Sequence, residues 1–312
     1  MLKKALCGAA AIFLAVQAPL PAKPLFWYED NNGGIAAGLP DDFERMFTEP
    51  DSWKELRSQI DVYYIRGNTL AAVIEKYGEG FIKDHFVKVL KDDDIVLAID
   101  NPGPHQKTLP LLKRCGADIG YIALQSTISK IRADDYKKDG GRLVAERINQ
   151  AADEIIALKK LYPGVQAGLI DATPTKGRDY VAPYHELARR LSENGTSLDF
   201  IHLDCPEEIA TEAKTITWDK VFEVEAFVRD ELKIPFGFIC TSATGGRSSD
   251  EAFYKNVLEI PAHYRGHQPD HFIVMSWFPH PQHSLPEKPP SGEYSMTKTA
   301  LDLFTALSRN GG

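Results

Sequence analysis

Residues 141–171 read GRLVAERINQAADEIIALKKLYPGVQAGLID, an amphipathic helix followed by a short apolar strand. Within the helical part, apolar side chains recur three and four positions apart, which places them on one face. They are Val144, Ile148, Ala151, Ile155 and Leu158. Pro163 and Gly164 end the predicted helix, and the strand that follows finishes at Asp171. Such alternation of helix and strand is typical of α/β proteins.

The same rhythm runs through most of the chain. Eight short apolar segments recur, most of them ending in a polar or acidic residue, and a segment of helical length follows nearly every one. The predicted strands are Phe26–Glu29, Asp61–Ile65, Ile95–Ile99, Ile119–Leu124, Ala167–Ile170, Leu198–Leu203, Phe236–Cys240 and Phe272–Ser276. Eight such repeats predict a single α/β domain, a closed (β/α)₈ or TIM barrel. An open doubly wound sheet is the alternative, but no glycine-rich phosphate loop follows the first strand.

Composition narrows the classes of partner. The chain has 312 residues and a formal net charge of −8. This balance argues against a nucleic-acid partner, because proteins that bind nucleic acids normally carry a basic surface. Beyond the N-terminal segment no run of eighteen apolar residues occurs. We therefore expect no membrane insertion of the mature chain, and the oligomeric state stays open.

The N-terminus resembles a secretory signal. Lys3 and Lys4 precede the apolar segment Ala5–Val16, which is too short for an ordinary spanning helix. Cleavage after Ala22 is predicted, so that residues 1–22 form a signal peptide and residues 23–312 form the barrel domain. A secreted or periplasmic location follows from this interpretation, and an uncleaved anchor is its alternative.

Three cysteines remain after that cleavage, and an odd number leaves at least one thiol unpaired. Cys205 and Cys240 lie at the ends of neighbouring predicted strands, so a disulfide between them and two buried thiols are both open alternatives. The spacing is not that of a zinc site. The histidines between His263 and His283 show no metal-binding pattern either. The sequence therefore predicts no metal site and no cofactor.

Barrels of this type place their chemistry at the carboxyl ends of the strands. The candidate ligand-binding residues at these ends combine carboxylates, an arginine and aromatic rings, and they are Tyr28, Glu29, Asp30, Arg66, Gln125, His202 and Trp277. This mixture suits a carbohydrate, whose rings stack on aromatic faces and whose hydroxyls donate to carboxylates. For His202, a hydrogen-bonded histidine of the core is the alternative interpretation.

Three aspartates are candidate catalytic residues. Glycoside hydrolysis needs two carboxyl groups, one of which is kept protonated. Asp171 and Asp204 end adjacent strands, and Asp100 stands across the mouth as a reserve. Asp171 is the candidate acid because apolar neighbours flank it, and Asp204 is the candidate nucleophile or base. For any one of these aspartates, a role in capping a loop is an equal alternative.

Several strand ends resemble those of secreted bacterial barrels of the glycoside-hydrolase type. The resemblance lies in Tyr121–Gln125, Gly168–Asp171, Asp199–Asp204 and the Trp277-Phe278-Pro279 segment. It implies a carbohydrate ligand and acid/base carboxylates. Many such enzymes carry a catalytic carboxylate after strand four and another after strand seven, whereas this chain has Gln125 and Thr241-Ser242 there.

The sequence therefore predicts an enzyme, a glycosidase acting at the C-terminal rim of a TIM barrel. A non-catalytic carbohydrate-binding barrel is one alternative, and Gln125 favours it. A metal-dependent sugar isomerase or epimerase is another, in which Asp171, Asp204 and a histidine would hold a divalent ion.

Overall fold

The computed structural model describes residues 23–30, 39–100, 108–211 and 216–310. Eight parallel strands pair in chain order, and β1 also pairs with β8, which closes the barrel. The strands are β1 Leu25–Glu29, β2 Val62–Arg66, β3 Val96–Asp100, β4 Ile119–Gln125, β5 Gln166–Asp171, β6 Ile201–Leu203, β7 Phe236–Cys240 and β8 His271–Val274. The predicted TIM barrel is confirmed, and each predicted strand overlaps the observed strand of the same rank.

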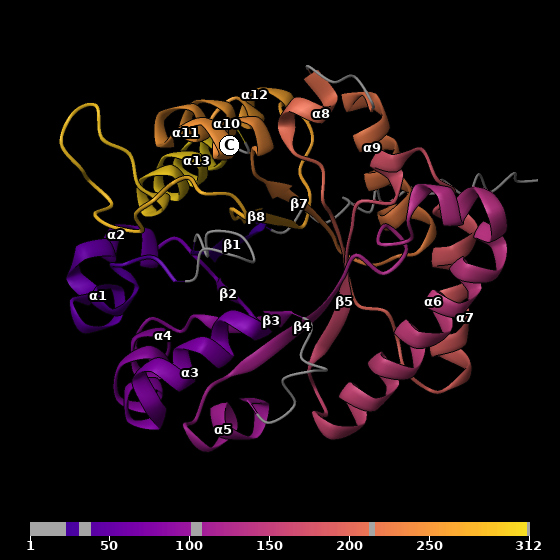
Figure 1. Ribbon diagram of the computed structural model, residues 1–312, viewed down its shortest axis with the longest axis horizontal. Coiled ribbons are helices and arrows are strands. Elements are labelled where there is room, and N and C mark those ends of the chain that lie inside the picture. Colours follow the sequence, from indigo (N-terminus) through magenta and orange to yellow (C-terminus); the bar gives the residue numbers. More distant parts are fainter. Residues whose placement is uncertain (1–22, 31–38, 101–107, 212–215, 311–312) are drawn as a thin grey trace, which may run out of the picture.

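Helices form a ring around the strands (Figure 1). The α-helices are α1 Phe43–Thr48, α2 Lys54–Arg57, α3 Gly67–Phe81, α4 Lys88–Asp92, α5 Thr108–Arg114, α6 Ala133–Leu161, α7 Val181–Glu193, α8 Glu207–Thr211, α9 Trp218–Ala226, α10 Ala243–Ser248, α11 Asp250–Val257, α12 Ile260–His263 and α13 Met296–Asn310. Short 3₁₀ segments (η1 Pro50–Trp53, η4 Pro174–Lys176) and π-helical segments (η2 Ile82–Val87, η5 Phe227–Glu231) complete the ring. Helix α6 contains the predicted helix 141–161 and is kinked at Asp139.

The strands separate two hydrophobic layers, because successive side chains of a strand point to opposite faces. One layer lies between the strands and the helices. The other fills the barrel interior and includes Trp27, Tyr64, Tyr121, Phe200 and Met275. The interior is therefore a packed core rather than a pore.

Glycine is required where a bulky interior ring crosses a neighbouring strand. A Cβ atom at Gly237 in β7 would lie 2.4 Å from Cδ2 of His202 in β6. These two residues are paired in the register of the strands. The missing side chain at position 237 thus makes the space that the imidazole of His202 occupies.

The structure decides between the two alternatives left open for the cysteines. Cys115, Cys205 and Cys240 are all buried free thiols. No disulfide joins the last two. Within the described ranges, no helix combines the length and the apolar character needed to cross a bilayer. The predicted signal peptide, residues 1–22, lies outside the described residues.

Candidate active site at the barrel mouth

The alternation of each strand decides which polar side chains face the mouth. In β2, Tyr64 belongs to the interior core, so Arg66, two residues later, continues the same inward face. In β3, Ala98 belongs to that core and Asp100 follows it in the same way. Gln125 ends β4 on the inward face as well. These side chains meet at the carboxyl ends of the strands, where TIM-barrel enzymes carry out their chemistry.

Arg66 is the electrostatic centre of this group. Its Nε lies 3.5 Å from Oε1 of Glu29, and both side chains are almost fully buried. Its guanidinium carbon lies 5.5 Å from the centre of the Trp277 ring. The positive charge also acts to lower the pKa of Asp100 and of Asp204. One buried cation thus balances carboxylates that come from three different strand ends.

Asp100 is oriented by its neighbours. Its Oδ1 accepts a hydrogen bond from the backbone N–H of Gly67 at 2.9 Å. Burial raises the pKa of Asp100, while the charge of Arg66 and hydrogen bonds from Gly67 and the Tyr64 hydroxyl oppose that rise. Gln125 Nε2 in turn donates to the Tyr64 hydroxyl at 3.2 Å. A chain of polar contacts therefore fixes the Asp100 carboxyl in one orientation.

Asp204 follows β6 on the inward face, two residues after the interior residue His202. Burial raises the pKa of Asp204 to about 6, and the negative charge of Asp171 adds to the rise. The charges of Lys176 and Arg66 oppose it. A carboxyl group with a pKa close to neutrality is suited to donate a proton in catalysis.

Asp171 faces the other way. It lies two residues after Leu169, which packs in the layer between strands and helices. Its carboxylate accepts hydrogen bonds from Ile128 N at 3.0 Å, Ser129 N at 3.2 Å, Thr173 N at 3.1 Å and Thr173 Oγ1 at 2.7 Å. These contacts fasten the β4–α6 connection to the end of β5. As predicted, the strand that ends at Asp171 is adjacent to β6. The Asp171 side chain, which was expected to be the catalytic acid, nevertheless points away from the mouth.

Tyr28 and Asp30 also lie behind the barrel wall. The hydroxyl of Tyr28 donates to Oδ1 of Asp30 at 2.9 Å. The Tyr28 ring is fully buried and packs against Trp53, with 6.0 Å between the ring centres. The tyrosine expected to stack on a ligand is thus part of the layer between strands and helices.

His202 occupies the barrel interior. Its Nε2 lies 2.9 Å from Nδ1 of His271, and its ring meets the edge of Trp27 with centres 4.8 Å apart. Burial lowers the pKa of His202 well below its usual value and that of His271 to about 4. This placement agrees with the alternative of a core histidine.

The histidines near the C-terminus serve in packing and pairing. His263 stacks on Trp218, with ring centres 4.2 Å apart, and His280 pairs with Asp250. No group of three or more His, Cys, Asp or Glu side chains among the described residues is arranged to hold a metal ion.

Two residues near the site were missed by the sequence reasoning. Tyr64 connects Gln125 to Asp100, and its inward position could have been read from its alternation with Arg66 in β2. Lys176 donates from Nζ to the carbonyl oxygen of Ser129 at 2.6 Å, and its charge reaches Asp204. It belongs to the short segment η4, where no periodic pattern signals the direction of a side chain.

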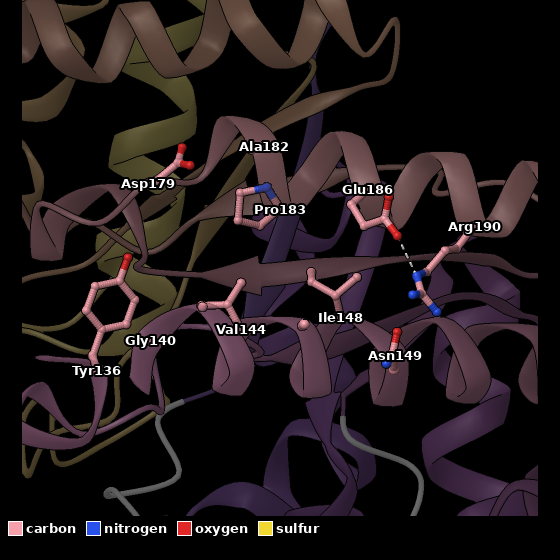
Figure 2. Close-up of a pocket in the computed structure, with 12 residues that line it drawn as sticks. Tyr136, Gly140, Val144, Ile148, Asn149, Asp179, Ala182, Pro183, Glu186 and Arg190 are labelled. Carbon is pink, nitrogen blue, oxygen red and sulfur yellow. Dashed lines mark hydrogen bonds and ion pairs between the residues drawn. The ribbon is translucent and has the colours of Figure 1, made fainter. Parts of the chain in front are cut away.

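A separate groove of about 320 Å³ lies between α6 and α7 on the outside of the barrel. Its middle is apolar, where Val144 and Ile148 of α6 point toward Pro183 of α7 (Figure 2). The ion pair between Glu186 and Arg190, 2.7 Å long, lies toward one end. The groove therefore belongs to the helical ring, and none of the carboxylates of the mouth lines it.

No protein-family model matches the chain, and no curated protein matches it. Solved structures do resemble it. A mutant of xylanase A from P. fluorescens subsp. cellulosa, in complex with xylopentaose, aligns with a TM-score of 0.51 and 11% identity over 92% of this chain and 99% of that one. A glucosidase from Croceicoccus marinus aligns with a TM-score of 0.52 and 11% identity over 91% and 68% of the two chains. A dihydropteroate synthase from Coxiella burnetii aligns with a TM-score of 0.47 and 11% identity over 93% of this chain and 94% of that one.

Likeness at such low identity shows the fold. The chain has the TIM-barrel architecture that these enzymes share. One fold of this kind hosts many unrelated reactions. The function therefore has to be argued from the side chains at the mouth.

Proposed function

We propose that the chain is a glycoside hydrolase in which Asp204 is the general acid and Asp100 is the nucleophile or base. The observation that carries the proposal is the pKa of Asp204, raised to about 6, on the same face as carboxylates balanced by Arg66. Glycosidases need this combination of one protonated and one ionised carboxyl group. The fold shared with a xylanase that binds xylopentaose supports a carbohydrate substrate.

Burial raises the pKa of Asp100 overall, but three neighbouring groups oppose that rise and stabilise its carboxylate form in the proposed reaction. A backbone N–H from Gly67, the hydroxyl of Tyr64 and the charge of Arg66 all stabilise a carboxylate. Glu29 holds Arg66 in place through their ion pair. Asp171 acts in this scheme as a positioning residue, because its hydrogen bonds hold the chain that follows Gln125.

Trp277 is the proposed stacking surface for the sugar. It is the aromatic residue of the predicted ligand-binding set that is partly exposed and lies beside Arg66. Indole rings stack well on the apolar faces of sugars. Gln125, whose Nε2 contacts Tyr64, is proposed to present its amide to the ligand from β4.

The test compares turnover of the wild-type protein with that of Asp204→Asn and Asp100→Asn. We expect each substitution to reduce turnover of polysaccharides about 10²–10⁴-fold. On dinitrophenyl glycosides, whose leaving group needs no proton, Asp204→Asn should keep most of its activity, whereas Asp100→Asn should not. Asp92→Asn is the matched control, since Asp92 is exposed on α4 and pairs with Lys88 on the same helix. Unchanged turnover in both mouth variants would remove this assignment.

A second candidate is a carbohydrate-binding barrel without catalysis. Gln125 and Thr241 favour it, because these residues at the ends of β4 and β7 supply no carboxylate to the mouth. This function predicts sugar affinity in calorimetry and no turnover in any of the assays above.

We also propose that the protein is exported. The support is the basic pair Lys3-Lys4 followed by the apolar segment Ala5–Val16. Intact-mass measurement of material from the periplasm or the medium should show the loss of residues 1–22. A retained N-terminus would contradict export by a cleaved signal.

A further inference from the structure

Two consecutive hydroxyl groups at the end of β7 have opposite surroundings. Ser242 Oγ accepts hydrogen bonds from Gly245 N at 2.9 Å and from Asn256 Nδ2 at 3.0 Å. Thr241 is also fully buried, yet its Oγ1 has no hydrogen-bond partner within the described residues. A buried hydroxyl without a partner destabilises the folded state, so such a group calls for an explanation.

Alternation directs Thr241 to the mouth. Ile239 belongs to the interior core, and Thr241 continues that face two residues later. After the neighbouring strand β8, Met275 belongs to the same interior core. Trp277 lies two residues later and therefore continues that inward face. The indole Nε1 of Trp277 is buried and also has no partner in the described parts of the chain. Two unpaired polar atoms therefore lie on the β7–β8 side of the mouth.

The indole is held in place by the charged centre of the site. The guanidinium of Arg66 lies 5.5 Å from the ring centre, and Arg66 is itself paired with Glu29. A cation over an aromatic face is attractive, and more so when both groups are shielded from water. The contact with Arg66 thus places the Trp277 ring, and with it the buried Nε1–H, beside the charged residues of the mouth.

We propose that Thr241 Oγ1 and Trp277 Nε1 form a subsite that binds a hydroxyl group of the carbohydrate ligand. A hydroxyl suits both atoms, because it accepts from the indole N–H and donates to the threonine oxygen. The subsite gives the buried Thr241 hydroxyl at the end of β7 the hydrogen-bond partner that it lacks within the described residues. The ligand class rests on the proposed function, whereas the unpaired atoms do not depend on it.

The first test measures stability without ligand. Thr241→Val keeps the shape of the side chain and removes the unpaired hydroxyl, so Tm should rise by about 2–4 °C. Thr173→Val is the matched control, since the buried Thr173 hydroxyl donates to Asp171 at 2.7 Å. Its Tm should fall. A lower Tm in Thr241→Val would show that the hydroxyl has an internal partner, such as a buried water, and would overturn the proposal.

The second test measures binding in ¹⁵N-labelled protein. The chain has four tryptophans, and Trp277→Phe identifies the indole signal of Trp277. Titration with xylo- and cello-oligosaccharides should move that signal downfield. Thr241→Val should weaken the affinity about tenfold, the loss of roughly one hydrogen bond, and Thr241→Ser should restore it. An unmoved Trp277 signal with every sugar, or equal affinity in Thr241→Val and wild type, would overturn the subsite.

The binding test needs no hydrolysis, so the two proposals fail separately. Binding at Trp277 without turnover would remove the hydrolase and leave the subsite. Turnover with an unmoved Trp277 signal would remove the subsite and leave the hydrolase.

Discussion

Asp171 and Asp204 end neighbouring strands and are joined through the backbone, yet their side chains lie on opposite faces of the barrel wall. The N–H of Asp204 donates to the carbonyl oxygen of Asp171 at 3.1 Å. The Asp204 carboxyl lies on the inward face with Arg66, whereas the Asp171 carboxyl binds the backbone of the β4–α6 connection. Of these two aspartates on adjacent strands, Asp204 is therefore a candidate catalytic residue, whereas Asp171 stabilises the structure.

The structural role of Asp171 predicts a loss of stability on its replacement. In Asp171→Ala, the N–H groups of Ile128 and Ser129 lose their acceptor in a buried setting. We expect the free energy of unfolding to fall by about 2–4 kcal/mol, measured by urea denaturation. Asp171→Asn, which keeps one acceptor oxygen, should lose less. A change of under about 0.5 kcal/mol in the alanine variant would contradict this role.

The raised pKa of Asp204 predicts a pH-dependent effect on stability. The folded protein holds the proton up to about pH 6, whereas an unfolded aspartate loses it near its ordinary value. Stability linked to this group is therefore full below pH 4 and is lost as the pH rises from about 4 to 6. Asp204→Asn should stabilise the protein at pH 7.5, by at most about 3 kcal/mol, and have little effect at pH 3.5. Equal effects of the substitution at both pH values, in thermal unfolding, would count against the raised pKa.

The charge of Arg66 predicts how the pKa values of the carboxyl groups at the mouth change when this residue is replaced. Its charge lowers the pKa of both Asp100 and Asp204, so Arg66→Gln should raise both. Titration of the aspartate carboxyl carbons by ¹³C NMR measures this without any substrate. Arg66→Lys keeps the charge and should retain most of the effect. If Arg66→Gln left both titrations in place, the central position given to Arg66 would be wrong.

The packing of the interior predicts a specific coupling between two residues. Gly237→Ala places a Cβ 2.4 Å from the His202 ring and should cost about 1–3 kcal/mol of stability. Combining it with His202→Ala should cost less than the sum of the two single changes, because the smaller side chain removes the clash. Gly141→Ala is the control, since nothing lies within 4 Å of the added Cβ in the exposed part of α6. It should stabilise the helix by roughly 0.5–1 kcal/mol. Strict additivity in the double variant would show that the barrel wall shifts instead.

The fold was predictable from the sequence because it repeats a strong local signal. Ile148 and Ile155 on one helical face, followed by the apolar strand that contains Leu169, already specify one unit of the barrel. Because TIM barrels place their chemistry at the carboxyl ends of the strands, Glu29, Arg66, Asp100 and Asp204 could be expected at one rim. The position of a residue at a strand end does not say whether its side chain faces the mouth or the surrounding helices.

That direction depends on the residue at which the alternation is counted. The predicted strand Ala167–Ile170 ended before Asp171, so the sequence did not assign the Asp171 side chain to either face. The observed strand β5 includes Asp171, and its alternation directs this side chain outward. Tyr28 and Asp30 were expected at the mouth although the predicted strand Phe26–Glu29 ends where β1 does, because neither face of that strand was assigned. The interior position of Trp27 directs Tyr28 to the other face. The influence of Lys176 on Asp204 arises from a loop, where no such rule exists.

The alternation at the rim also constrains how proteins of this shape diverge. Deleting one residue between Leu169 and Asp171 would turn that carboxyl toward the mouth, and the loop fastened by it would come free. New mouth residues are therefore gained more readily by substitution at positions that already face inward, such as Gln125 and Thr241, than by insertion or deletion. A single change from Gln125 to glutamate would place a fourth carboxyl group in the mouth while leaving every strand in register.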